Sequence, residues 1–308
     1  MALRAAFEWL GSCSGCEIAF LNIGEDLIGL LSEELEVVHM PLLMDHKYCT
    51  PADGSGDIII PFAEIGFISG GVGNDEHLAV LKEMRRKCDF LVAMGTCATH
   101  GGIPALMNGR NQQQSWEEIF QVSDAATESV VPESEVPEPL DRVYACDEKI
   151  KIDLLLPGCP PNPQLMLQVL RSILDKEELH LPSRSVCDTC PVKREGKGTV
   201  SSVKRFVVNA EYDSEEPLEK MRCLLEQGFM CMGPVTLAGC ASSGAPSCIQ
   251  ARVPCRGCYG PVRQNGNQML DMMNAMASNN IDFKSVVDRR SLLRFSGAHG
   301  RLRPLKKR

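Results

Sequence analysis

The chain has 308 residues, of which 44% are hydrophobic and 23% charged, and its net charge is −8. This composition indicates a globular protein that buries a sizeable core in one or two domains, and it excludes an intrinsically disordered chain. The longest apolar stretches, near residues 58–62 and 90–94, are far shorter than a membrane span, so we predict no membrane span.

The number of cysteines and the expected compartment together indicate what the cysteines do. The N-terminal residues run directly into an apolar segment without a charged leader or a signal core, which predicts an intracellular, cytoplasmic protein. Disulfides do not persist in a reducing compartment, and the 15 cysteines cannot pair completely. Metal binding is the remaining use. Zinc and iron–sulfur clusters both accept four thiolates at C-x-x-C spacings, and the prolines beside several cysteines favour clusters without deciding the matter.

The first predicted elements are a strand at residues 5–10, a tight turn, and a helix over residues 18–31. The turn carries Cys13 and Cys16 in a C-x-x-C. The start of the following helix offers unpaired N–H groups and a positive dipole end, both of which stabilise thiolates. This turn therefore suits a metal site.

Alternating strands and helices continue to about residue 176. Strands are predicted at 36–40, 64–71, 90–96 and 152–156, and helices at 75–86 and 164–174. This alternation is typical of a doubly wound, flavodoxin-like α/β domain with a parallel sheet, which we place at residues 1–176. The glycines at 70, 71 and 73 resemble a phosphate-binding turn but lack its full motif, so we interpret them as a tight strand-to-helix turn.

Two further cysteines follow predicted strands of this domain. Cys97 ends the apolar run that starts at Phe90, and Cys159 follows the run that starts at Ile152. Because ligands of open parallel sheets bind outside the carboxyl ends of the strands, both thiols are expected to converge with Cys13 and Cys16. The four cysteines then form one four-thiolate site. Separate buried thiols are the alternative.

An acidic, proline-bearing stretch spans residues 116–148 and holds ten carboxylates. It is expected to be an exposed excursion between two strands, either plain solvated surface or part of a partner interface.

The pattern changes in the second half, which we place at residues 177–308. Regular periodicity fades, glycine and proline are frequent, and eight cysteines lie between residues 187 and 258. Eight thiols are two sets of four, so this domain is expected to be irregular and built around its metal centres. Two zinc sites are the alternative to clusters.

The C-terminal residues 284–308 carry nine Lys or Arg and a single acid, Asp288. This asymmetry favours either a docking tail for an acidic partner or a solvated terminus. The acidic balance of the whole chain and the lack of interleaved aromatics argue against a nucleic-acid partner.

The motifs of both halves together resemble those of one family, the electron-transferring small subunit of [NiFe] hydrogenases. The resemblance covers nearly the whole chain. It rests on residues 11–17, 95–97 and 156–163 in the first half, on Cys187-x-x-Cys190-Pro191, Cys223 and residues 231–234, and on Cys240 and residues 254–261.

The resemblance implies three [4Fe–4S] clusters with four cysteines each. Family members often place a histidine at position 187 and a proline at position 248, whereas this chain has cysteine at both. The implied ligands are Cys13, Cys16, Cys97 and Cys159 for the proximal cluster, Cys240, Cys248, Cys255 and Cys258 for the medial cluster, and Cys187, Cys190, Cys223 and Cys231 for the distal cluster. Cys49, Cys88 and Cys146 are left over, and Cys88 is expected in the core.

Within the family, the chain is most similar to the cytoplasmic F420-non-reducing, or methyl-viologen-reducing, hydrogenases of methanogens. The resemblance implies a large-subunit partner that holds the nickel–iron active site, and an iron–sulfur acceptor subunit linked to heterodisulfide reductase. Glu17, beside the proximal cysteines, is a candidate for proton transfer, and a plain helix-N-terminal carboxylate explains it as well. The alternatives are the cluster subunit of a complex I-type dehydrogenase and a zinc-stabilised interaction module.

Overall fold

The computed structural model describes residues 2–44, 58–122, 130–131, 134, 136–196, 198, 200–241 and 244–304. Two compact units make up the chain, residues 1–160 together with 297–308, and residues 161–296. We expected the division after residue 176. The first part of the first unit instead ends at residue 160, and the last twelve residues, 297–308, also belong to this unit. The second unit is therefore an insertion in the sequence of the first.

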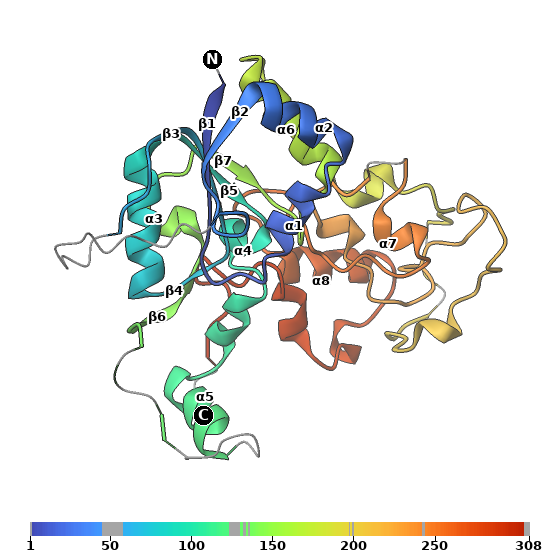
Figure 1. Cartoon of the computed structure of the whole chain (residues 1–308). Coiled ribbons are helices and arrows are strands. Elements are labelled where there is room, and N and C mark those ends of the chain that lie inside the picture. The colour runs from blue at the N-terminus through green and yellow to red at the C-terminus, as the bar shows by residue number, and fades with distance from the viewer. Residues whose placement is uncertain are drawn as a thin grey trace. The chain divides into compact units, whose positions relative to one another are not determined.

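The first unit is built on a five-stranded parallel sheet (Figure 1). Its order is β2-β1-β3-β5-β7, which is the flavodoxin-like order and confirms the predicted doubly wound fold. From β1 the chain continues to β2 on one side, and later strands are added on the other side as β3, β5 and β7. The order therefore reverses between β1 and β3, which makes this the topological switch point. The strands are β1 (Leu3–Trp9), β2 (Leu35–His39), β3 (Ala63–Ser69), β5 (Cys88–Met94) and β7 (Leu154–Leu156).

Helices cover both faces of this sheet. Figure 1 shows α3 (Asp75–Lys87) on one side, and α1 (Gly15–Leu21) and α2 (Glu25–Gly29) on the other. The ring of Phe7 on β1 stacks on the ring of Phe67 on β3, with their centroids 4.7 Å apart, and its centroid lies 4.6 Å from that of Phe20 on α1. Apolar side chains on both faces of the strands explain why they read as continuous hydrophobic runs.

The helix expected over residues 18–31 is interrupted. Helix α1 ends at Leu21, Gly24 has a φ of 94°, and α2 continues as a π-helix over Leu30–Glu34. The positive φ of Gly24 is incompatible with a continuous helix, and glycine adopts it at low cost.

The acidic excursion contains more regular structure than expected. Its described part includes α5 (Gln112–Glu117), a π-helix over Glu118–Val122, and β6 (Pro139–Tyr144). Strand β6 pairs in the antiparallel sense with β4 (Val72–Asn74). Three short helices complete this unit: α4 (Thr96–His100), η2 (Pro104–Gly109) and η4 (Cys146–Glu148).

The second unit is irregular, as expected. Its described residues form no strand beyond isolated bridges, and its apolar clusters include Cys231 and Cys255. Its α-helices are α6 (Pro163–Leu174), α7 (Ser247–Gln250) and α8 (Gln268–Ser278), and its 3₁₀ turns are η5 (Val186–Thr189), η6 (Val207–Asn209), η7 (Gly233–Val235), η8 (Phe283–Ser285) and η9 (Arg289–Leu293).

Candidate functional site

The C-x-x-C turn lies between β1 and α1, as predicted. Cys13 is exposed on the turn, and Cys16 is buried in the first turn of α1. Between them Ser14 has a φ of 61°, a left-handed conformation that closes the turn tightly. Both thiols therefore lie at the carboxyl end of β1, next to the switch point.

Cys97 and Cys159 follow the neighbouring strands β5 and β7. Cys97 does not end its strand as expected, because β5 stops at Met94 and Cys97 lies in the short helix α4. The two loops are joined by hydrogen bonds of 2.8 Å from the Thr96 N–H to the Gly158 carbonyl and from the Gly158 N–H to Thr96 Oγ1. The loops that carry both thiols are therefore fixed to each other.

The four proximal thiols lie close enough for their charges to interact. The pKa of Cys16 is raised by burial first, and then by Glu17, Cys97, Cys159 and Cys13. Burial is also the main reason why the pKa of Cys97 rises to about 11, with Cys159 and Cys13 contributing. The sheet thus brings the four cysteines together, and their role as ligands stays a prediction.

Glycines bring the backbone very close to two of these sulfurs. A Cβ at Gly95 would lie 2.3 Å from Cys16 Sγ, and a Cβ at Gly102 would lie 2.6 Å from Cys97 Sγ. No side chain fits at either position, so the thiols are enclosed by backbone. The glycine pair Gly101-Gly102, which follows Cys97 after three residues, is a sequence signal for this enclosure that we did not recognise from the sequence.

Glu17 is buried at the switch point. Its Oε1 accepts a hydrogen bond from the Ser69 hydroxyl at the end of β3, and Oε2 has no partner among the described residues. Burial raises the pKa of this carboxyl, although the Ser69 hydrogen bond lowers it. Ser69 could not be identified from sequence, since it lies 52 residues away.

The predicted distal cysteines line one cavity of about 290 Å³ in the second unit, together with Cys255. The pKa of Cys187 rises to about 12 through burial, and then through Cys231, with smaller effects of Cys190 and Cys223. A Cβ at Gly233 would lie 3.0 Å from Cys187 Sγ and 3.7 Å from Cys231 Sγ. Glycine at position 233 therefore leaves room between two of the four thiols.

The predicted medial cysteines are linked more loosely. Cys248 raises the pKa of Cys240, after burial, while Cys258 and Cys248 both contribute to the raised pKa of Cys255, after burial and Cys231. The Cys255 N–H also donates to Cys231 Sγ at 3.3 Å. Cys255 therefore lies between the medial and distal groups, which the sequence did not indicate.

The donors of all three predicted sets are cysteine thiols, which are the ligands that iron–sulfur clusters take. None of the fourteen described cysteines forms a disulfide, and Cys49 lies outside the described residues. Within the described ranges, no three His, Cys, Asp or Glu side chains are arranged to hold one metal ion. Each thiolate of a cubane binds a different iron, so its ligands stand further apart than those of one ion.

Cys88 and Cys146 have core positions. Cys88 begins β5 and is buried in the apolar cluster of the first unit, as expected. Cys146 is fully buried, and its Sγ donates to the Gly70 carbonyl at 3.7 Å. The turn at Gly70 is tight, since a Cβ there would lie 2.9 Å from the backbone of Leu10 and Gly11. It leads into strand β4 and not, as expected, directly into a helix.

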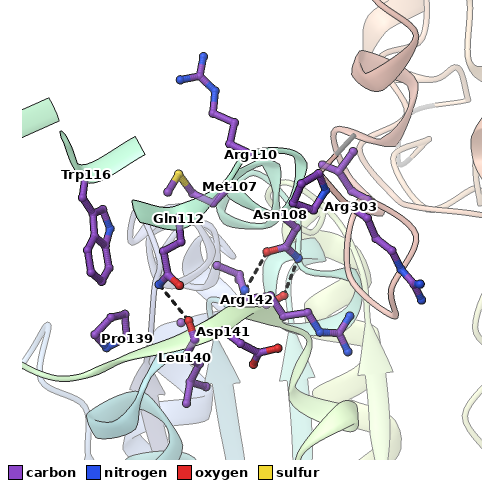
Figure 2. Close-up of a pocket in the computed structure, with 14 residues that line it drawn as sticks. Met107, Asn108, Arg110, Gln112, Trp116, Pro139, Leu140, Asp141, Arg142 and Arg303 are labelled. Atoms are coloured by element: carbon purple, nitrogen blue, oxygen red, sulfur yellow. Dashed lines mark hydrogen bonds between the residues drawn. The ribbon is translucent and has the colours of Figure 1, made fainter. Parts of the chain in front are cut away.

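A separate cavity of about 490 Å³ lies beside β6 (Figure 2). Asn108 both donates to the Val143 carbonyl and accepts from the Val143 N–H at 2.8 Å, and Gln112 donates to the Leu140 carbonyl at 2.9 Å. No described cysteine lines this cavity. It is thus distinct from the thiol sites.

No helix in the described part of the chain has both the length and the hydrophobicity that crossing a membrane requires.

Comparison with known proteins connects these thiol sites to one kind of protein. Residues 13–173 match the family described as NADH ubiquinone oxidoreductase, 20 Kd subunit. A subunit of the F420-non-reducing hydrogenase of Methanothermobacter marburgensis is 34% identical over 93% of this chain and 87% of its own length. The NAD-reducing hydrogenase HoxS subunit delta of Cupriavidus necator is 32% identical over 59% of this chain and 83% of its own length.

Solved structures show the same likeness. A chain of an NAD⁺-reducing [NiFe]-hydrogenase in the H2-reduced state has a TM-score of 0.53 at 32% identity, covering 59% of this chain and 96% of that one. A chain of the Dm. baculatum [NiFeSe]-hydrogenase also has a TM-score of 0.53, at 16% identity, covering 91% and 99%. The latter supports the fold alone.

Proposed function

Because the chain belongs to the family of NADH ubiquinone oxidoreductase 20 Kd subunits, and within it to the [NiFe] hydrogenase small subunits of the F420-non-reducing type, we propose that it is the electron-transfer subunit of such an enzyme. It is a subunit of a hydrogenase whose active site lies on a partner large subunit. The observation that carries the proposal is the convergence of four thiols at the carboxyl ends of β1, β5 and β7.

The proposal favours a hydrogenase over a complex I-type subunit. The family match stops at residue 173, whereas the subunit of the F420-non-reducing hydrogenase of Methanothermobacter marburgensis matches 93% of the chain, which includes its second, cysteine-rich half. The complex I-type subunit that the sequence resembles less closely carries one cluster, so eight further cysteines between residues 187 and 258 would have no metal to bind in it.

The chain's residues are proposed to hold three [4Fe–4S] clusters, each through the proximal, medial or distal set of four cysteines defined above. Iron–sulfur clusters supply reversible one-electron chemistry when bound. The protein's part is to fix the thiols, exclude water and set the surrounding hydrogen bonds. Burial of Cys16, the enclosing Gly95 and the N–H of Cys255 that points at Cys231 all serve this part.

A large-subunit interface is proposed around the proximal thiols. Two exposed apolar side chains lie near them in the chain: Ile18, two residues after Cys16, is 50% exposed, and Ile103, which follows α4, is 44% exposed. Obligate interfaces are large and apolar, so these residues are suited to be covered by the partner.

We further propose a cytoplasmic setting and an iron–sulfur acceptor subunit that leads toward heterodisulfide reductase. The supporting observation is the likeness to the F420-non-reducing hydrogenases over nearly the full length of both chains.

Metal analysis of the anaerobically purified complex tests the proposal. We expect about twelve iron atoms per copy of this chain, no zinc, and visible absorption and electron paramagnetic resonance (EPR) signals of [4Fe–4S] clusters. This chain by itself should bind no nickel. Zinc in place of iron, or a fully loaded monomer that oxidises H2 without a large subunit, would contradict the proposal.

A further inference from the structure

The last described residues, 297–304, return to the first unit and pack against the helix that carries Cys97. We call them the C-terminal strap. The Ala298 N–H donates to the His100 carbonyl at 3.1 Å, and Ala298 is fully buried. Leu302 is also buried, with its side chain 3.4 Å from where a Cβ at Gly109 would lie. The strap is therefore part of the core of this unit, although its sequence reads as a basic tail.

The strap and Cys97 lie on opposite sides of a glycine pair. A Cβ at Gly101, whose φ is +83°, would lie 2.6 Å from the Ala298 Cβ. A Cβ at the next residue, Gly102, would lie 2.6 Å from Cys97 Sγ. The Gly101 N–H also donates to the Cys97 carbonyl at 3.0 Å. The strap thus packs directly against the backbone segment that encloses the thiol.

A second contact anchors the strap. His299 Nε2 lies 2.9 Å from Asp147 Oδ1 on η4. The imidazole ring of His299 is also edge-on to that of His100, with the ring centroids 6.5 Å apart. Cys146, beside Asp147, is fully buried. The strap therefore joins two segments that are far apart in the sequence, α4 and η4.

We infer that the C-terminal strap is a positioning element for Cys97, so that the proximal four-thiol site is complete only when residues 297–304 are in place. The inference rests on the proposed function, because it assigns Cys97 to a cluster. Close packing explains the effect: interiors are dense, so a group removed from one side of Gly101 lets the other side relax. Since the strap follows Cys258, the last cysteine of the sequence, the proximal site is expected to close only after residues 297–304 have been synthesised.

Two truncations of the complex with its large subunit test this inference. A chain that ends at Ser296 should lose about a third of its iron, since one of three clusters is lost. It should also lose the EPR signal of the proximal cluster, which is identified as the signal missing from a Cys97→Ser variant. A chain that ends at Pro304 removes four residues beyond the strap and should keep both. Retention of the proximal signal in the chain that ends at Ser296 would overturn the inference.

A substitution covers the case in which the shorter chain does not fold. Ala298→Leu in the full-length chain forces a larger side chain against Gly101 and should lower the proximal signal while the other cluster signals persist. Arg303→Leu places the same side chain at an exposed position of the strap and should leave all signals unchanged. An Ala298→Leu chain with full proximal signal contradicts the inference. A full-length chain without iron would refute the proposed function instead.

Discussion

The space around individual cysteine sulfurs is limited by glycines. A Cβ would collide with Cys16 Sγ at Gly95 and with Cys97 Sγ at Gly102, so a single methyl group is the smallest change that tests these sites. Gly95 is also required for its backbone conformation, because its φ of +88° is one that glycine adopts at low cost and other residues rarely adopt.

Gly95→Ala should remove the proximal cluster. The added methyl would lie 2.3 Å from Cys16 Sγ, closer than any real contact, so either the thiol or the loop must move. We expect loss of the proximal EPR signal and of about a third of the iron. Gly24→Ala is a matched control, since φ there is +94° and nothing lies within 4 Å of its Cβ. The control should lower the free energy of unfolding by about 1–3 kcal/mol from backbone strain and keep all iron. Equal iron in both variants would disprove a specific role for Gly95.

Cys248 tests the medial ligand set. It lies in the first turn of α7, directly after Ser247, where proline is tolerated because the N–H groups there have no partner within the helix. Cys248→Pro should therefore keep the fold, remove about one iron per chain and convert the medial cluster to a three-iron form. The loss of an iron corner should also raise the medial reduction potential.

EPR of the oxidised Cys248→Pro protein gives the answer, with Cys248→Ala as a control for backbone effects. A new three-iron signal is expected in both variants. If neither shows it, Cys248 is an unligated thiol and the assignment is wrong.

At the scale of elements, one arginine connects the end of α3 with two strands of the sheet. Arg85 donates to Asp153 Oδ2 at 2.5 Å and to the Cys88 carbonyl at 2.6 Å, and Asp153 also accepts from the Leu91 N–H at 2.9 Å. These bonds tie α3, β5 and the approach to β7 together. They hold the base of the strands whose other ends carry Cys97 and Cys159.

Arg85→Gln should lower the free energy of unfolding by about 1.5–3 kcal/mol, the usual range for hydrogen bonds to charged groups. Its neighbour Arg86 pairs with Glu83 at the surface, so Arg86→Gln should cost less than about 1 kcal/mol. Denaturant unfolding of both variants compares them directly. Equal losses would show that the Arg85 contacts do not stabilise the sheet.

The Arg85–Asp153 pair also predicts a pH dependence. Burial raises the pKa of Asp153, but hydrogen bonds from Arg85 and Leu91 outweigh it and leave the pKa below the ordinary 3.8. Since the pKa is lower in the folded state, the pair's contribution is complete above pH 3.8 and is lost as the pH falls through the lowered value. Asp153→Asn should therefore be less acid-sensitive than the parent in this range, as measured by unfolding at several pH values.

At the scale of the whole molecule, we expect the two units to depend on metal to different degrees. The first unit has a five-stranded sheet and a continuous apolar core. The second has no strand among its described residues, and the thiols of Cys231 and Cys255 are themselves part of its apolar cluster. If these cysteines hold clusters as proposed, this core should lose its centre when the metal is removed.

Anaerobic removal of iron by a chelator should therefore unfold the second unit first. We expect hydrogen exchange, followed by mass spectrometry, to speed up across residues 187–258, while the strands of the first unit stay protected. The iron-loaded protein is the control. Unchanged exchange in residues 187–258 after complete iron removal would show that apolar packing alone folds this unit.

Local patterns in the sequence were enough to predict much of this protein. The alternation of strands and helices, the thiols beyond β1, β5 and β7, and the irregular second half all depend on spacing between near neighbours, which the sequence displays directly. The tertiary structure alone decided the order of the strands, the break at Gly24, the contact of Glu17 with Ser69, the place of Cys255 between two thiol groups, and the burial of Ala298 within the first unit. Most of these features join residues far apart in the chain, so no local pattern records them, and the positive φ of Gly24 interrupts a stretch whose apolar spacing is helical throughout.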